Sequence, residues 1–324
     1  MRITTLHRAK AHDEGAWCSC WVPGSNRLLT GSVDETVKIW EDTDDGLNCA
    51  HTYSGQEGHA LGVVSVAANS TGEFAASSAL DSYVRVWSLA DHSIAAMIEA
   101  ATTETWSLTF SPQQSEGLLL AVAGGTRGAV VLWNISSGEE SAVFKAELSL
   151  PALADDKQRR TERFVLSVAF SPDGKRLACG AMDGTVAVYD VASGTALGVL
   201  QGHYKPVRSL TFLPDSRSLL TACDDMHVNL YDVENTSLIE SFSGHGSWVL
   251  SVAAHPSGTS FASGGADAKV KLWDLGARAC VQTVTDHTDQ VWSVAFSSDG
   301  NRLASVSDDK QAIVYSYGGN VPQT

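Results

Sequence analysis

The sequence is poor in basic residues and in long apolar runs. Lys and Arg number 22 against 37 Asp and Glu, which gives a formal net charge of −15. This excess of negative charge repels a polyanion over any broad face, so direct binding of nucleic acid is not expected. No apolar run approaches the roughly 18–20 residues that a helix needs to cross a bilayer, and the first residues lack the apolar core of a signal peptide. We therefore expect no membrane partner.

The sequence also lacks a framework of paired cysteines. It has six Cys, at positions 18, 20, 49, 179, 223 and 280, and none of them form a Cys-x-x-Cys pair. Free thiols in a reducing compartment are expected from this pattern. We expect a protein of the nucleus and cytoplasm, with no catalytic residue, no cofactor and no metal.

The composition is that of a folded soluble protein. Hydrophobic residues make up 44% of the 324 residues and charged residues 18%. This length is short for two ordinary domains and ample for one large domain. We expect one domain over residues 1–324, with an insertion at 144–163 and a flexible tail at 318–324.

A 42-residue repeat organises the chain. Seven similar segments, among them SVDETVKIW, AMDGTVAVY and GADAKVKLW, each end in an aromatic residue. These aromatic residues are Trp40, Trp87, Trp133, Tyr189, Tyr231, Trp273 and Tyr315, and successive gaps are 47, 46, 56, 42, 42 and 42 residues. The three longer gaps contain extra residues between strand patterns, where loops tolerate added length. The period therefore predicts seven equivalent units.

The pattern inside each unit is that of β-strands. Segments such as VLSVAAH and KVKLWDL are rich in Val and alternate or run apolar, and Asp-Gly or Ser-Gly turns separate them. Four short antiparallel strands fit each unit, and a single such sheet would be only marginally stable. Seven sheets arranged radially cover one another, which predicts an all-β, seven-bladed β-propeller. The last unit has only three strand patterns, so we expect residues 2–9 to supply its fourth strand and close the ring.

The repeats resemble those of WD-repeat β-propellers across nearly the whole chain. The Trp-Asp pair itself occurs at Trp273 and Asp274, with Tyr189-Asp190 and Tyr231-Asp232 as variants. Five units also carry a His 22 residues before an Asp, and a Ser or Thr four residues before that Asp. An enzyme needs one such site, so five copies at fixed spacing indicate a structural device rather than a hydrolase. The resemblance implies hydrogen-bonded tetrads, which are His12, Thr30, Asp34, Trp40; His59, Ser77, Asp81, Trp87; His203, Thr221, Asp225, Tyr231; His245, Ser263, Asp267, Trp273; and His287, Ser305, Asp309, Tyr315.

Two units depart from this pattern. The third has Ala101, Ala123 and Arg127 in place of His, Ser and Asp, and the fourth has Thr161 and Cys179 while keeping Asp183 and Tyr189. We expect these two blades to be the looser pair, either through drift or because the insertion between them serves a partner.

One rim of the propeller is a candidate binding surface. Residues three and five positions after each His position point to the face that carries the loops between blades, and four Trp, one Phe and one Arg gather there. Trp and Arg are typical of binding hot spots, which favours an extended peptide with an apolar and a basic side chain. The candidate residues are Trp17, Glu104, Trp106, Phe164, Leu166, Arg208, Trp248, Leu250, Gln290 and Trp292, with Asp224, Asp308 or Glu104 meeting the basic side chain.

Longer stretches are similar to one WD-repeat family. GHYKPVRSLTFLPDSRSLLTACDDMHVNLYDV and TDHTDQVWSVAFSSDGNRLASVSDDK resemble the WD-repeat subunit shared by the superkiller (SKI) and polymerase-associated factor (PAF) complexes, and LTGSVDETVKIW looks most like its plant members. This resemblance implies a non-enzymatic scaffold, monomeric within a hetero-oligomer, that binds helical-repeat (TPR-type) subunits in mRNA decay and in transcription elongation with histone modification.

Other readings of a WD-repeat propeller remain open. A histone-tail reader uses the same face. A substrate receptor of a cullin ubiquitin ligase often carries Arg two residues after Trp-Asp, whereas here Leu275 and Gly276 follow. A G-protein β subunit would have a helical N-terminal extension, and only 11 residues precede His12. The fold alone does not choose among these functions.

Overall fold

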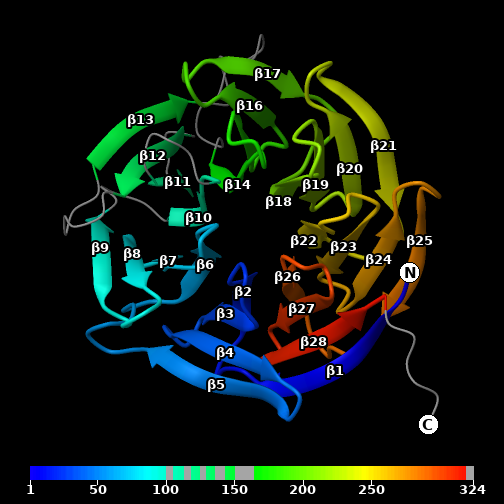
Figure 1. The fold of residues 1–324 in the computed structure, drawn as a ribbon. Coiled ribbons are helices and arrows are strands. Elements are labelled where there is room, and N and C mark those ends of the chain that lie inside the picture. Colours follow the sequence, from blue (N-terminus) through cyan, green and yellow to red (C-terminus); the bar gives the residue numbers. More distant parts are fainter. Residues whose placement is uncertain (100–104, 113–117, 125–128, 136–142, 150–163, 319–324) are drawn as a thin grey trace.

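The chain forms a ring of seven four-stranded antiparallel sheets (Figure 1). This computed structural model describes residues 1–99, 105–112, 118–124, 129–135, 143–149 and 164–318, with the backbone alone for 143–149. The ring confirms the expected all-β, seven-bladed propeller. In each blade the first strand lies nearest the central axis and the fourth lies at the circumference (Figure 1).

The strands follow the repeat in order. Blade 1 contains β2 (Ala16–Trp21), β3 (Arg27–Ser32), β4 (Val37–Thr43) and β5 (Gly46–Tyr53). Blade 2 contains β6 (Val63–Ala68), β7 (Phe74–Ala79), β8 (Tyr83–Ser88) and β9 (Ile94–Glu99). Blade 3 contains β10 (Thr105–Phe110), β11 (Leu118–Gly124), β12 (Ala129–Ile135) and β13 (Val143–Ser149). Blade 4 contains β14 (Val165–Phe170), β15 (Arg176–Ala181), β16 (Val186–Asp190) and β17 (Ala196–Leu200).

The remaining strands complete the ring. Blade 5 contains β18 (Val207–Phe212), β19 (Ser218–Cys223), β20 (His227–Asp232) and β21 (Ser237–Ser243). Blade 6 contains β22 (Val249–Ala254), β23 (Ser260–Gly265), β24 (Val270–Asp274) and β25 (Ala279–Val284). Blade 7 contains β26 (Val291–Phe296), β27 (Arg302–Ser307), β28 (Gln311–Tyr317) and β1 (Ile3–Lys10).

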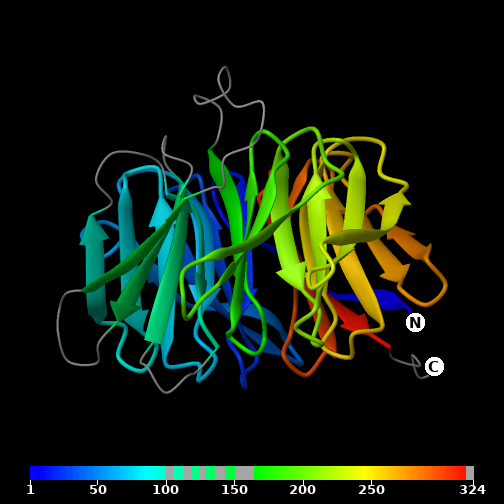
Figure 2. The same ribbon diagram turned by 90° about the horizontal axis from the view of Figure 1, so that it is seen from above.

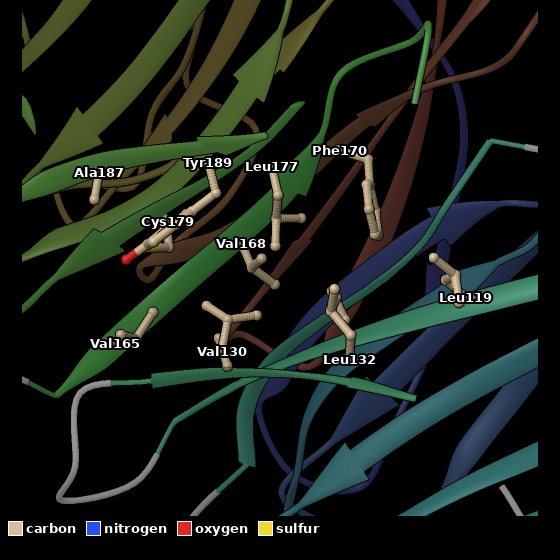
Figure 3. Close-up of a cluster of buried hydrophobic side chains, with 12 residues drawn as sticks. Leu119, Val130, Leu132, Val165, Val168, Phe170, Leu177, Cys179, Ala187 and Tyr189 are labelled. Carbon is tan, nitrogen blue, oxygen red and sulfur yellow. The ribbon is translucent and has the colours of Figure 1, made fainter. Parts of the chain in front are cut away.

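The core lies between the blades and not inside any one of them. Seven clusters of buried apolar side chains each join residues of two adjacent blades. Figure 3 shows one of them, in which Leu119 and Leu132 of blade 3 face Val168 and Phe170 of blade 4. Each sheet therefore buries both faces only when its neighbours are present, which is why the sequence needs a complete ring of repeats.

The N-terminal strand closes the ring as the sequence predicts. β1 pairs with β28 antiparallel, and Ile3 lies opposite Tyr317. The Ile3 N–H donates to Gln282 Oε1, and Gln282 Nε2 donates to the Ile3 carbonyl, each at 2.8 Å. Blade 7 thus joins strands from the two ends of the chain, and a glutamine on blade 6 holds the first of them (Figure 1).

Part of the expected insertion is a strand. Residues 144–149 belong to β13, which pairs with β12, so the range predicted as an insertion begins too early. The error arose because the repeat count located extra residues between two aromatic positions without showing where the fourth strand ends. Residues 150–163 and the tail from 319 onward lie outside the described residues.

Two faces bound the ring, which Figure 2 shows from its edge. We call the face with the connections between blades and the turns between second and third strands the top face. The turns between first and second strands lie on the opposite face, where Gly24, Gly72, Gly174, Gly258 and Gly300 all have φ between 69° and 74°. Over the described ranges there is no helix of the length and apolarity needed to span a membrane.

Candidate functional site

The predicted tetrads lie within the blades, between the first-strand entry and the second and third strands. In blade 1 the Trp40 indole donates to Thr30 Oγ1 at 2.8 Å, Thr30 Oγ1 lies 2.8 Å from His12 Nε2, and His12 Nδ1 lies 3.0 Å from Asp34. Because Asp34 is a carboxylate, Nδ1 carries the ring proton and Nε2 accepts from the Thr30 hydroxyl. The chain of bonds ties three strands of one blade together.

Blade 6 repeats this geometry. The Trp273 indole donates to Ser263 Oγ at 2.8 Å, and the same oxygen lies 2.7 Å from His245 Nε2. His245 Nδ1 is 3.0 Å from Asp267. In this arrangement every polar atom of the four side chains that faces the interior has a partner, as buried polar groups require.

In blades 5 and 7 tyrosine replaces tryptophan. Ser305 Oγ lies 2.7 Å from His287 Nε2 and 3.3 Å from the Tyr315 hydroxyl, and His287 Nδ1 lies 2.8 Å from Asp309. In blade 5, His203 bridges Asp225 at 2.6 Å and Thr221 at 2.8 Å. Tyr231 there accepts a hydrogen bond from Asn229 at 2.9 Å.

Blade 2 has a different network. His59 lies 3.0 Å from Asp81 and within hydrogen-bond distance of Ser77, but the buried Trp87 indole nitrogen has no hydrogen-bond partner. Arg85 Nη1 approaches His59 Nδ1 at 2.7 Å. Because a guanidinium only donates, Nδ1 accepts here and the ring proton lies on Nε2, the reverse of blade 1. Burial, with a further contribution from Arg85, lowers the pKa of His59 to about 4.

The tetrad carboxyls are held in their charged form. Burial alone would raise their pKa, but hydrogen bonds from backbone N–H groups, joined in blades 1, 5, 6 and 7 by one from the histidine, outweigh it, and each pKa is lowered. The five histidine side chains are at most 1% exposed. Side chains this deeply buried and fully hydrogen-bonded are suited to holding the blades together.

Blades 3 and 4 have Ala123 and Cys179 at the position of the tetrad Ser or Thr. Ala123 and Cys179 are fully buried in the cluster between the two blades. Ala101, Arg127 and Thr161 lie outside the described residues. That these blades are the looser pair stays a prediction.

The top face carries a clasped carboxylate between blades 7 and 1. Trp17 Nε1 donates to Asp308 Oδ1 at 3.0 Å, and Trp292 Nε1 donates to Asp308 Oδ2 at 2.7 Å. The two indole rings are 5.5 Å apart and inclined by 42°. A Cβ on Gly15 would overlap Asp308 Oδ1, so glycine makes room for the carboxylate. All three side chains are partly exposed, which leaves a negative group flanked by aromatic rings at the surface.

A second group, with the single aromatic ring of Trp248, lies on blades 5 and 6, next to blade 7 in the ring. Arg208 Nη2 donates to Asp224 at 2.8 Å, and its Nε contacts the same carboxylate at 3.0 Å. The guanidinium carbon lies 5.9 Å from the Trp248 ring centroid, and Trp248 is 47% exposed. Asp224 is therefore occupied by Arg208, and of the acids predicted to meet a partner's basic side chain, Asp308 retains the more open position.

The other candidates divide between surface and core. Trp106 and Phe164 lie 6.2 Å apart, edge to face, between blades 3 and 4. Gln290 is half-buried, and its carbonyl accepts from the Asp308 N–H. Glu104 lies outside the described residues.

Leu166 and Leu250 do not belong to this surface. Both are 4% exposed, and each lies within an innermost strand whose neighbours cover it. Counting five residues from the His position gives a position along the innermost strand. It does not show whether the side chain at that position faces the central opening or packs into the core.

The spacing rule also missed several exposed apolar side chains. Val33, Leu61, Met182, Tyr204 and Met226 are each between 36% and 72% exposed on top-face loops and turns. Met182 and Val33 immediately precede the Asp position of their blades, and Met226 immediately follows it. Positions next to that Asp are therefore a sequence signal for this surface, because the Asp fixes the turn and its neighbours point outward.

A groove of about 830 Å³ lies on the opposite face where blades 7 and 1 meet. Trp21, Asn26, Asp42, Asp299 and Arg302 are among the residues that line it. Arg302 Nε donates to Asp42 Oδ2 at 3.0 Å, and His7 Nε2 lies 3.5 Å from Asp42 Oδ1. The lining of the groove is about equally polar and apolar, and Asp42 and Arg302 pair across the closure of the ring.

Comparison with known families agrees with the geometry. The family model "WD domain, G-beta repeat" matches residues 3–41, 47–88, 236–274 and 278–316. The chain is a WD40-repeat β-propeller. In this propeller the matched repeats begin in a fourth strand and end in a third, so sequence repeat and structural blade differ by one strand. A second model, "Nucleolar protein 10-like, N-terminal domain", matches residues 107–247.

The chain is also similar to individual WD-repeat proteins. The propeller is 46% identical over 206 residues to the WD repeat-containing protein VIP3 of Arabidopsis thaliana, covering 61% of this chain and 60% of VIP3. It is 33% identical over 213 residues to the WD repeat-containing protein SL1-17 of Schistosoma mansoni, covering 64% of each. The matched part thus spans less than two thirds of either relative. The expected similarity to the plant member is confirmed by VIP3.

Proposed function

We propose that this protein is a non-enzymatic scaffold subunit that binds peptide segments of partner proteins on its top face. The observation that supports this most directly is the Asp308 carboxylate clasped by Trp17 and Trp292. Each indole donates one hydrogen bond, which leaves acceptor capacity on both carboxylate oxygens. An Arg or Lys side chain from a partner would meet that charge and pack against the rings.

The surroundings favour a basic segment. The exposed Glu35 and Asp289 on neighbouring loops add to the negative potential of this part of the face, whereas Asp13 and Glu14 pair with Lys10 and Lys310. The exposed Trp248 and Met182 offer an apolar contact for the same segment farther around the mouth. A partner segment would therefore be extended, with a basic residue at blades 7 and 1 and an apolar residue toward blades 4 to 6.

The partners we propose are helical-repeat (TPR-type) subunits of the PAF and SKI complexes. The support is the similarity to VIP3 together with the earlier resemblance to the subunit shared by those assemblies. In this proposal the propeller works in the nucleus, in transcription elongation and histone modification, and in the cytoplasm, in mRNA decay linked to the exosome. It acts as a monomer within each hetero-oligomer and makes no direct contact with nucleic acid.

The test is affinity purification of the tagged full chain from nuclear and cytoplasmic fractions, with variants of the top face. Trp248→Gln, Trp292→Gln and Gly15→Ala should each lose at least about 10-fold of the co-purified helical-repeat protein, since hot-spot residues contribute about 2 kcal/mol or more. Gly15→Ala acts by displacing Asp308. The matched control is Leu238→Gln, an exposed apolar residue on the circumferential strand β21.

Retention of the same partners by folded top-face variants would contradict the proposed surface. Purification that yields no helical-repeat subunit from either fraction would contradict the proposed complexes.

A second candidate is a histone-tail reader. Two tilted indole rings beside a carboxylate also suit a lysine ammonium, including a methylated one. A peptide array of histone tails distinguishes the two, because a reader binds isolated tails whereas the scaffold binds the helical-repeat subunit and leaves the array blank.

A further inference from the structure

Blade 5 brings three metal-ligating side chains together beside its tetrad. Cys223 stands two residues before the tetrad Asp, where blades 1 and 7 have Ser32 and Ser307. One ligand atom each of His203, Cys223 and Asp225 lie within 4.8 Å of one another. In the described part of the chain, this is the one group of three or more His, Cys, Asp or Glu side chains with that property.

A fourth polar group against this cluster has an unused acceptor. Asn229 is 2% exposed, and its Oδ1 has no hydrogen-bond partner. Its Nδ2 lies 3.5 Å from His203 Nδ1, so the carboxamide packs against the imidazole, and turning the carboxamide over would bring Oδ1 to that position. A buried carbonyl oxygen without a donor is costly, and a cation in the cluster would satisfy it.

We propose that His203 Nδ1, Cys223 Sγ and a carboxylate oxygen of Asp225 bind one Zn²⁺ ion, with Asn229 Oδ1 as the fourth ligand. Nitrogen, thiolate and carboxylate ligands in a four-coordinate arrangement are those that zinc takes in proteins. The side chains must close in from their present spacing, and the His203–Asp225 hydrogen bond is replaced by two bonds to the metal.

Neighbouring groups already support this ligand set. When Nδ1 binds the ion, the ring proton of neutral His203 moves to Nε2, which lies 2.8 Å from Thr221 Oγ1. The Thr221 hydroxyl can then donate to the backbone carbonyl of Asn229, 3.5 Å away. The backbone N–H of Asp225 donates to Cys223 Sγ at 3.4 Å, an interaction that stabilises a thiolate. Outer partners of this kind orient the ligands of metal sites.

Proton balance gives the site a characteristic pH dependence. The Cys223 thiol donates to the Lys205 carbonyl at 3.2 Å, and burial raises its pKa, so the thiol is protonated at neutral pH. Metal binding breaks that S–H bond and releases one proton to solvent, while the His203 proton only changes nitrogen. The apparent affinity therefore increases about 10-fold per pH unit.

The experiment is a titration of the metal-free full chain with Co²⁺, followed by Zn²⁺. We expect one equivalent of Co²⁺ to produce a thiolate-to-cobalt charge-transfer band, Zn²⁺ to abolish it by displacement, and the melting temperature to rise with bound metal. Cys223→Ser introduces the residue that blades 1 and 7 have at this position, so it should fold, and it should lose at least about 100-fold in affinity. The matched control is Cys280→Ser, a change at an exposed cysteine on β25 that should leave binding intact.

Absence of the band in the wild-type chain at one equivalent overturns the proposal, and so does a band that survives in folded Cys223→Ser. A band lost in Cys280→Ser would assign the thiolate to the surface and also overturn it. None of these outcomes depends on whether the top face binds a partner peptide.

Discussion

At the scale of single residues, the serine at one position of the tetrad makes different hydrogen bonds in different blades. Ser263 Oγ joins the Trp273 indole to His245, whereas Ser77 contacts His59 and leaves the Trp87 indole without a partner. Blade 2 also differs in Arg85, whose guanidinium lies 2.7 Å from His59 Nδ1 and makes that nitrogen an acceptor. Equal sequence motifs therefore need not have equal energetic weight.

We predict that Ser263→Ala destabilises the protein more than Ser77→Ala. The first change leaves a buried indole N–H and a buried histidine nitrogen without partners, and the second affects the histidine alone. The expected loss in free energy of unfolding is about 2–4 kcal/mol for Ser263→Ala and about 1–2 kcal/mol for Ser77→Ala. Denaturant unfolding of both variants measures it, and equal losses would show that the tryptophan bond carries no stability.

His59 gives the protein a pH-dependent stability in the mildly acidic range. Its pKa is about 4 in the folded chain, against an ordinary value of 6.5. The unfolded chain binds the proton more tightly, so the contribution is fully present above pH 6.5 and is lost as pH falls toward 4. The wild-type free energy of unfolding should fall as the pH is lowered from 6.5 to 4. We predict that this fall is about 2–3 kcal/mol smaller in His59→Gln. Unfolding curves across the range measure it, with His227→Gln, a partly exposed histidine outside the tetrads, as the control.

The residue scale is where prediction from sequence was least complete. The spacing of His, Ser or Thr, and Asp identified five sets that the structure brings together. It could not show that Arg85 alters one of them or that Leu166 and Leu250 face the core, because a repeat count assigns position along a strand and not side-chain direction. The clasp on Asp308 joins residues 291 positions apart and depends on ring closure.

At the scale of elements, β1 is the strand on which the ring depends. It covers the outer edge of β28 and places Ile3, which is 1% exposed, in the cluster between blades 6 and 7. Thr5 donates to Asp286 at 2.6 Å, which adds a second tie to the loop that follows blade 6. The sequence predicts this pairing from the missing fourth strand of the last unit.

We predict that deletion of residues 2–9 lowers the melting temperature of the whole ring by 10 °C or more, roughly the effect of a few kcal/mol in a chain of this size. The open edge of β28 and the uncovered cluster next to it are the physical reason. Scanning calorimetry measures the change, and an unchanged melting temperature would refute the role of β1. The control is Leu6→Thr, which alters an exposed side chain of β1 and keeps its backbone pairing.

At the scale of the whole molecule, the fold was predictable and the surface only in outline. Seven repeats of about 42 residues predict seven blades. They form a closed ring because each blade must cover the faces of its neighbours. The exposed apolar residues on the top face vary from blade to blade, and a repeat pattern contains little information about what varies. The departure of blades 3 and 4 was visible in the sequence, but its consequence for a partner was not.

The net charge of −15 should increase the rate at which a basic partner segment associates with the protein. We predict that the association rate constant of the purified partner segment falls at least about 10-fold from low to physiological ionic strength, because salt screens the attraction. Asp308→Asn should also slow association and weaken its dependence on salt. Stopped-flow measurements over a salt series test this, and a rate independent of salt would contradict electrostatic steering.

The pairing of Ile3 with Tyr317 sets an order on biosynthesis. The strand that leaves the ribosome first has no partner until the last blade has been made, so six blades must form while their closing strand is still unpaired. Contacts so distant along the chain slow folding and leave an edge available to other molecules in the meantime. Nascent chains of this protein should therefore need protection by chaperones until the last blade is complete and β1 has paired with it.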